Sequence, residues 1–230
     1  NNLSTVKPVG DIEELQGYWE PSERAQRIEE LLEQRNDWTL EDLQKVQLDH
    51  FLVSGPTLTK SMIESLSPKK TEMSSMEQNA FERLSNWDYQ FDVENVGATI
   101  FTVFCEAILH NLLLDELGDD IFRAYCTTAD HWSFFKYVIH DDNCFLWDDI
   151  STQEEETRSD IVFRSFQESV KMLHKKLGKD ISQWKWGQIH TLEFHHPLGY
   201  IPILRKIFNV GPFPCPGACN VINNMLYFES

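Results

Sequence analysis

The stretch VGATIFTVFCEAILHNLLL, residues 96–114, is the longest apolar run in the chain. A membrane span needs roughly 18–20 uninterrupted apolar residues, whereas Glu106, His110 and Asn111 interrupt this run. It therefore predicts a buried core helix and no membrane span. Its apolar side chains keep the spacing of one helix face: Phe101, Phe104, Cys105, Ile108 and Leu112.

Segments upstream and just downstream of this run also favour helix. Thr39 is a good N-cap, and the acidic residues that follow it suit the positive end of a helix dipole. Gly55-Pro56 breaks one helix before the next begins, and Pro68 predicts a loop over 67–75. The expected helices cover residues 22–35, about 38–53, a segment from about 57, residues 75–87 and residues 119–140.

The next predicted helix has clear start and stop signals. Thr152 and Glu155 have the Thr-x-x-Glu spacing of a capping box. Gly178 supplies the C-terminal stop. The apolar positions between these signals keep helical spacing: Val162, Phe166, Val170, Leu173 and Leu177.

Aromatic and histidine residues crowd together after Gly178. Zinc usually takes two ligands from one element, at i,i+4 on a helix or i,i+2 on a strand. His190 and His195 fit neither spacing, so we expect these rings to pack with tryptophans and to hydrogen-bond to the backbone. A metal-dependent hydrolase is the weakest functional hypothesis. The crowded residues are Trp184, Trp186, His190, His195 and His196.

The final apolar run, residues 225–228, reads as a short strand. A strand has to pair with another strand, and nothing earlier in the sequence is an obvious partner. This mismatch indicates that part of the fold lies in sequence beyond these 230 residues.

The charge balance excludes some partners. Lys and Arg number 20 and Asp and Glu 37, a formal net charge of −17. An acidic surface repels phosphate backbones and anionic membranes, so nucleic acid is not an expected partner.

Local nucleophile and ligand patterns are weak. His110 lies five residues after Cys105, off its helix face, so the pair does not predict cysteine catalysis. Cys215 and Cys219 flank a Pro-Gly-Ala loop and could be either bridged or reduced. The carboxylates of 141–142 and 148–149 lack EF-hand spacing and predict capping or solvated groups.

Six phrases keep a fixed order along the chain. They are Asn1-Asn2; Tyr18-Trp19 with Arg24-Ala25-Gln26-Arg27-Ile28 and Leu31-Leu32; Trp87-Asp88; Trp147-Asp148-Asp149 with Thr152 and Glu155; Trp186-Gly187 with His190 and His196-Pro197-Leu198; and Gly217 to Phe228 with Asn223-Asn224. Together they resemble the catalytic subunit of the penicillin acylase family of N-terminal nucleophile hydrolases.

That resemblance implies a fold that is mainly α within this chain and belongs to an αββα sandwich with a large helical insertion. Residues 1–21 would leave the sandwich as an irregular segment. Residues 22–210 would form the helical section, and residues 211–230 would return to the sandwich as a loop and strand.

The resemblance also implies a reaction and site residues. The family cleaves linear acyl amides with an N-terminal Ser, whose own α-amine is the general base. Asn1 matches the oxyanion-hole Asn, and Arg24 matches an arginine that positions the catalytic groups. Without the resemblance, Arg24 reads as a surface arginine paired with Glu20 or Glu23. Asp11 lies near a position that can hold calcium; no cofactor is needed for catalysis.

This chain begins with Asn, whose amide is not a nucleophile, so the nucleophile is expected outside it and the chain alone should be inactive. The expected partners are a small-molecule acyl amide and the remainder of the same precursor. The family resemblance implies a periplasmic or secreted enzyme. The alternative is a non-catalytic, acidic helical interaction module.

Overall fold

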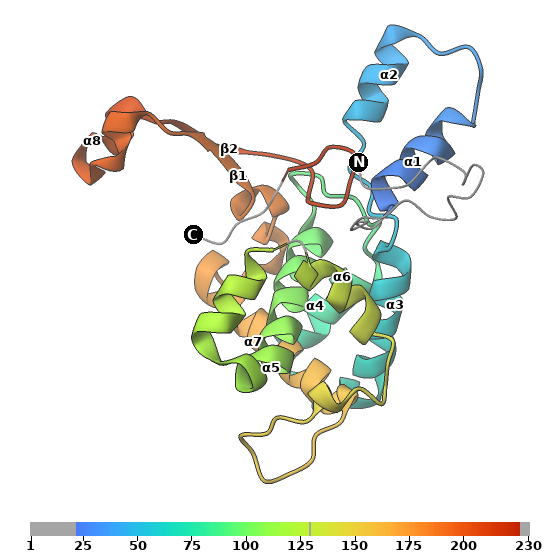
Figure 1. The fold of residues 1–230 in the computed structure, drawn as a ribbon, viewed down its shortest axis with the longest axis vertical. Helices are drawn as coiled ribbons and strands as arrows, with labels where there is room; N and C mark the ends of the chain where they lie inside the picture. The colour runs from blue at the N-terminus through green and yellow to red at the C-terminus, as the bar shows by residue number, and fades with distance from the viewer. Residues whose placement is uncertain (1–21, 129, 226–230) are drawn as a thin grey trace, which may run out of the picture.

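The computed structural model describes residues 22–128 and 130–225, and its central element is helix α5, Val96–Cys126 (Figure 1). The buried helix predicted for residues 96–114 is confirmed, because Phe101, Phe104 and Ile108 have no exposed area. Among the described helices, α5 alone has the length and apolarity of a membrane span, yet 72% of its most apolar window is buried inside the fold. That burial is typical of a core helix.

Helix α5 bends at Gly118, where the backbone adopts φ 71° and ψ 165°. These angles lie in a region that side-chain-bearing residues rarely adopt, and glycine enters it freely. The helix predicted over 119–140 is therefore divided between the end of α5 and helix α6, Asp130–Val138.

Helix α7, Arg158–Leu177, packs along α5 and closes the core. The rings of Phe104 and Phe166 meet edge to face with centroids 5.1 Å apart. Above this apolar contact, the Asn111 amide donates to Ser165 Oγ at 2.9 Å and to Glu168 at 2.7 Å. Full burial of each such aromatic ring contributes roughly 2–3 kcal/mol, so the α5–α7 pair supplies much of the stability.

Shorter helices surround this pair and connect it to the periphery. Two of them, α3 and α4, pack against both α7 and each other. The remaining elements are α1 (Glu23–Leu32), α2 (Leu40–Gln47), α3 (Gly55–Leu66), η1 (Ser67–Glu72), α4 (Ser75–Ser85), η2 (Phe145–Trp147), η3 (Ile181–Gln183) and η4 (Trp186–Gln188).

Several predicted boundaries need correction. The helix capped by Thr39 ends at Gln47, before the expected Val53. Pro56 does not precede α3 but lies in its first turn, where a missing backbone N–H costs nothing. The predicted loop over 67–75 contains the 3-10 helix η1.

The capping box of α7 lies five residues later than predicted. Thr157 and Asp160 form it, each side chain bonding the other's backbone. Thr152 instead donates its hydroxyl to Glu154 O and Glu156, so it stabilises the preceding loop. The stop at Gly178 is confirmed by its φ of 88°.

The sequence did not predict the β-hairpin that projects from the body (Figure 1). Strand β1, Thr191–Phe194, pairs antiparallel with β2, Val210–Pro214, with Leu192 opposite Phe213. Between the strands lie η5 (Pro197–Tyr200) and α8 (Pro202–Phe208). The αββα sandwich implied by the resemblance is not part of the described residues. Most of the strand predicted over 225–228 also lies outside them.

Candidate functional site

Arg24 is the predicted site residue that the structure describes, and α1 carries it. The neighbouring Glu23 fixes this helix to the body. Its carboxylate is only 7% exposed, receives Lys136 Nζ of α6 at 2.9 Å, and accepts the Ser54 backbone N–H at 3.1 Å. Of the two partners predicted as an alternative for Arg24, Glu23 is engaged by Lys136 instead, and Glu20 lies outside the described residues.

Arg27, one turn further along α1, makes the second anchor. Its guanidinium donates to both carboxylate oxygens of Asp49, with Nε–Oδ1 at 3.2 Å and Nη2–Oδ2 at 2.9 Å. The same guanidinium lies 4.6 Å from the Phe51 ring centroid. This hydrogen bonding with Asp49 raises the pKa of Arg27. Because the planar guanidinium bonds both carboxylate oxygens, it fixes the orientation of the Arg27 side chain better than a lysine ammonium, which acts as a point charge, would.

Residues 215–225, near the C-terminal end of the chain, contact Asp49 and Arg24 beside α1. The Asp49 carbonyl accepts the Asn223 backbone N–H at 2.8 Å. With its amide oriented to satisfy both ends, Asn224 accepts from Arg24 Nη1 at 3.2 Å and donates to the Cys219 carbonyl at 2.9 Å. Arg24 Nε is buried and has no hydrogen-bond partner among the described residues. The side chain therefore retains donor capacity beside this segment.

Aromatic residues hold the 215–225 segment against the body. Trp186 Nε1 donates to the Gly217 carbonyl at 3.0 Å, and the Gly217 N–H donates to Phe91 O at 2.8 Å. Gly217 has φ 92°, and a Cβ there would lie 2.3 Å from the Asn223 carbonyl oxygen. Glycine is therefore required at this close approach.

Asn1 and Asp11, the predicted oxyanion and calcium residues, lie outside the described residues. Within those residues, 22–128 and 130–225, no three His, Cys, Asp or Glu side chains gather as metal ligands. Sequence reasoning considered Glu23 only as a partner of Arg24 and overlooked Asp49, because the partners that both carboxylates have in the structure are distant in sequence or carry no motif.

The histidines after Gly178 are divided by the fold. His190 is buried, stacks on Trp186 with centroids 4.7 Å apart, and its Nδ1 lies 2.7 Å from Cys215 O. This confirms the expected packing for His190. His195 and His196 instead belong to the projecting hairpin, where His195 stacks on Tyr200 and His196 on Phe208.

The cysteines and the acidic pairs have structural surroundings. Burial raises the pKa of the Cys105 thiol well above its usual value, so this sulfur stays protonated and is a poor nucleophile. Cys215 and Cys219 are not bridged. In the carboxylate pairs, Asp142 receives Arg158 Nε at 2.7 Å and Asp149 receives Arg164 Nη2 at 2.9 Å. Asp148 accepts the Glu156 N–H in the loop before the Thr157 N-cap, so it stabilises that loop and caps no helix.

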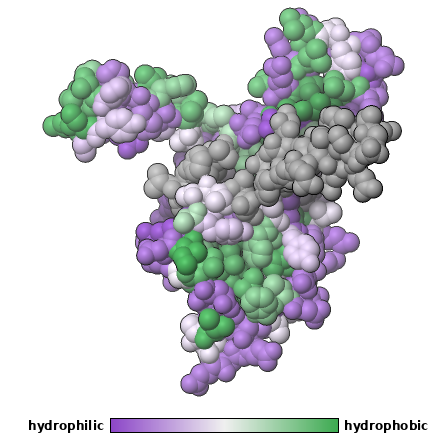
Figure 2. Space-filling view, viewed as in Figure 1, coloured by the Kyte–Doolittle hydropathy of each residue, from purple (hydrophilic) through white to green (hydrophobic). Residues whose placement is uncertain are grey.

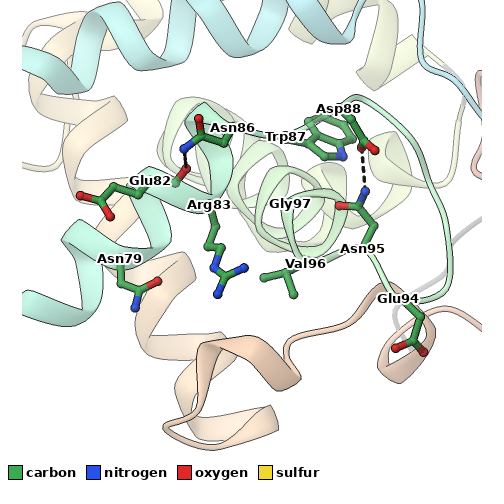
Figure 3. Close-up of a pocket in the computed structure, with 10 residues that line it drawn as sticks. All are labelled: Asn79, Glu82, Arg83, Asn86, Trp87, Asp88, Glu94, Asn95, Val96 and Gly97. Atoms are coloured by element: carbon green, nitrogen blue, oxygen red, sulfur yellow. Dashed lines mark hydrogen bonds between the residues drawn. The ribbon is translucent and has the colours of Figure 1, made fainter.

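A polar hollow lies between α4 and the start of α5 (Figure 3). Arg83 extends into it from α4, and Val96 and Gly97 form its floor. The Asn95 amide donates to Asp88 Oδ1 at 2.8 Å, so these two groups satisfy each other. The residues that line the hollow include no hydroxyl, thiol or imidazole, so the lining lacks the Ser, Thr or Cys nucleophile expected of the family.

Comparison with known proteins gives consistent matches. A family model described as penicillin amidase matches residues 1–230. The acyl-homoserine lactone acylase QuiP of Pseudomonas aeruginosa is 24% identical over 207 residues, which cover 84% of this chain and 24% of that protein. The QuiP acylase of Pseudomonas syringae pv. syringae is 24% identical over 248 residues, covering 96% of this chain and 28% of that protein. The chain thus spans about a quarter of the length of these curated relatives.

Proposed function

This chain belongs to the penicillin amidase family, and from that premise we propose that it is part of an acylase that hydrolyses a linear acyl amide. The observation that carries the proposal is the family match over all 230 residues. Arg24 supports it, because the structure anchors its helix on both sides of that residue. The fragment would work together with the remainder of the same precursor.

In the proposed reaction, a Ser at the N-terminus of the catalytic subunit lies outside this chain. Its Oγ attacks the amide carbonyl while its α-amine takes the hydroxyl proton. The tetrahedral intermediate then expels the amine, which leaves with a proton, and water hydrolyses the resulting ester. The Asn1 side-chain NH2 donates to the developing oxyanion, an interaction worth roughly 3–4 kcal/mol of barrier.

Arg24 is proposed to position the catalytic groups rather than to react. A guanidinium stays charged at every accessible pH and presents several donors in one plane. One donor holds Asn224, and the buried Nε faces no partner among the described residues. That unused donor fits a contact with the nucleophile-bearing part of the enzyme.

The substrate class follows from the names of the relatives, which are acyl-homoserine lactone acylases. We propose an N-acyl amide as the substrate, and acyl-homoserine lactones are the first compounds to assay. A periplasmic or secreted location and a calcium ion held near Asp11 are further parts of the proposal. No cofactor takes part in the proposed bond cleavage.

The proposal is tested on the protein made from its full natural reading frame. Intact mass and N-terminal sequencing should find a subunit that starts at Ser, Thr or Cys upstream of Asn1. That enzyme should release the free acid from an acyl-homoserine lactone or a chromogenic acyl amide. A mature product that starts at Asn1 and lacks this activity would instead favour the non-catalytic helical module.

Site substitutions separate the residue roles. Asn1→Ala should lower kcat by about a hundredfold or more, the typical loss of one oxyanion donor. Asn2→Ala is the matched control and should leave kcat near that of the unaltered enzyme. If Asn2→Ala alone lowers kcat, the oxyanion donor is the neighbouring residue. If neither substitution does, the assignment of the oxyanion group to this segment is wrong.

A further inference from the structure

The Asn224 side chain joins α1 to the segment over residues 215–225. Its amide oxygen accepts from Arg24 Nη1 at 3.2 Å, and its amide nitrogen donates to the Cys219 carbonyl at 2.9 Å. A carboxylate can only accept and an ammonium can only donate, whereas an amide does both from one rigid plane. The donated bond orients the amide, and the oriented amide then fixes the position of the Arg24 guanidinium.

The backbone that carries Asn224 is itself held in place. The Met225 N–H donates to the Ala218 carbonyl at 3.2 Å, and the Asn223 N–H donates to the Asp49 carbonyl at 2.8 Å. Gly217, at the start of the same turn, is bonded through its N–H and through its carbonyl to residues of the body. A residue can position another only if its own backbone is fixed, and Asn224 meets that condition.

Arg24 differs from most other arginines of the chain in the kind of group that holds it. All eight arginines lie within residues 22–128 and 130–225. Six of them have a carboxylate oxygen at 3.8 Å or less, so that their charge is compensated. These six are Arg27, Arg35, Arg123, Arg158, Arg164 and Arg205. Within the described part of the chain, Arg24 is instead held by the neutral amide of Asn224.

A neutral partner is unexpected in so acidic a chain. Asp and Glu number 37 against 20 Lys and Arg, and hydrophilic residues cover much of the surface seen in Figure 2. The carboxylates close to Arg24 are engaged by other cations, Glu23 by Lys136 and Asp49 by Arg27. A carboxylate partner would cancel much of the guanidinium charge, whereas an amide acceptor leaves that charge in place.

We propose that Asn224 is a positioning residue, which holds Arg24 through a neutral amide so that the guanidinium is fixed in direction and keeps its charge for the catalytic groups. A fixed, uncompensated charge stabilises the negative charge that develops on the reacting carbonyl oxygen. The inference rests on the proposed function, from which it takes the role of Arg24. The contact between the two side chains does not depend on that role.

The first test is Asn224→Ala in the full-length enzyme, with active sites counted by titration with a sulfonyl fluoride that reacts with the nucleophilic Ser. Loss of the acceptor should lower kcat per titrated site about tenfold, because the guanidinium is no longer held. KM should stay within about threefold of its original value. A lower titre with unchanged kcat per site would show a merely structural role and overturn the proposal.

Asn224→Asp separates a neutral partner from any partner. The carboxylate keeps an acceptor for Arg24 but compensates its charge, so kcat per site should again fall about tenfold. Unchanged kcat would overturn the proposal. Asn220→Asp is the matched control, since it adds the same charge to the same segment at a side chain that does not bond Arg24; it should change kcat by less than about twofold. Equal losses in the two variants would also overturn the proposal.

Glu20, which lies outside the described residues, is the competing partner of Arg24. Glu20→Gln removes that carboxylate and should change kcat by less than about twofold. A tenfold loss in Glu20→Gln together with none in Asn224→Ala would assign the holding of Arg24 to Glu20 and overturn the proposal.

Amide hydrogen exchange of residues 217–225 tests the contact without reference to activity. Asn224→Ala and Arg24→Met should each speed this exchange about five- to tenfold. The double variant should exchange no faster than the faster single variant, because both changes remove the same contact. Effects that multiply would overturn the proposal. If the unaltered protein shows no acylase activity, the proposed function is refuted, and the exchange experiment still decides whether Asn224 holds Arg24. Coupled exchange with unchanged kcat in Asn224→Ala refutes the positioning role alone.

Discussion

Glu23 should control how firmly the Arg24-bearing helix is held. The carboxylate is 7% exposed and its partner, the Lys136 ammonium, is 19% exposed. Glu23→Gln keeps the size of the side chain and an acceptor for the Ser54 N–H, so it removes mainly the charge opposite Lys136. Breaking a fully buried pair costs about 3–5 kcal/mol, and the partial exposure of Lys136 reduces this to about 2–3 kcal/mol.

This loss should appear locally, because α1 lies at the edge of the molecule and the core is formed by α5 and α7. A decrease of 2–3 kcal/mol corresponds to amide exchange in α1 that is about 30–150-fold faster. Hydrogen exchange followed by mass spectrometry measures this directly, and α7 serves as the internal reference. Exchange in α7 should remain unchanged.

Two further variants complete the experiment. Glu30 is 52% exposed, and its Oε2 lies 3.4 Å from Arg27 Nη1. Glu30→Gln removes this exposed ion pair and should change amide exchange in α1 by less than about threefold. Glu23→Gln combined with Lys136→Met should be less harmful than Glu23→Gln alone, since no unpaired charge remains. The reasoning is refuted if Glu23→Gln leaves α1 exchange unchanged, or if the double variant exchanges faster than the single one.

Three further predictions concern the stability of the body, each measured by urea denaturation. Gly97→Ala should destabilise by about 1–3 kcal/mol, because its Cβ would lie 2.6 Å from the buried Trp87 ring; an unchanged midpoint would show that the ring moves freely. Thr157→Ala should lower the free energy of unfolding by about 1 kcal/mol, and Thr152→Ala by less than about 0.5 kcal/mol. A larger loss for Thr152→Ala would show that Thr152 caps α7, as the sequence predicted. The hydrogen bond from the Lys69 ammonium, with that from the Thr157 hydroxyl, lowers the pKa of Asp160 to about 2. The ionised Asp160 carboxylate therefore stabilises the fold fully above its unfolded pKa near 3.8, and this stabilisation is lost as pH falls through 2. Because the side chain is 39% exposed, Asp160→Asn should lower the free energy of unfolding by only about 1 kcal/mol at pH 7 and by nothing below pH 2.

The parts of the fold that the sequence predicted are those specified by local periodicity. Helix α5 has a continuous apolar face, and the described structure buries it as expected. Thr39 and Gly178 were also recognised, since caps act within a few residues of the helix end. The α7 start was misplaced because Asp148, Glu156 and Thr152 bond to one another and remove Thr152 from the capping position.

The hairpin and the anchors of α1 depended on distant contacts. Strand β2 contains Pro212 and Pro214, which argue against a central strand but are tolerated at a sheet edge. Glu23 forms an ion pair with Lys136, which lies 113 residues away in the sequence, and no local pattern relates the two residues. Arg24 was identified only through the family resemblance, because an arginine on an amphipathic helix is ordinarily a solvated residue.

The geometry of α1 explains how one short helix can be anchored to the body and still orient Arg24, the residue proposed to position the catalytic groups. Glu23 and Arg27 are four residues apart, so they lie on the same face and anchor it at two levels. Arg24 follows Glu23 by one residue, which turns its side chain by about 100° around the helix axis. That rotation points it toward Asn224 instead of the body. The anchors therefore fix the rotation of the helix, and the rotation fixes the direction of the Arg24 guanidinium, so Glu23 and Asp49 contribute to the proposed site without touching it.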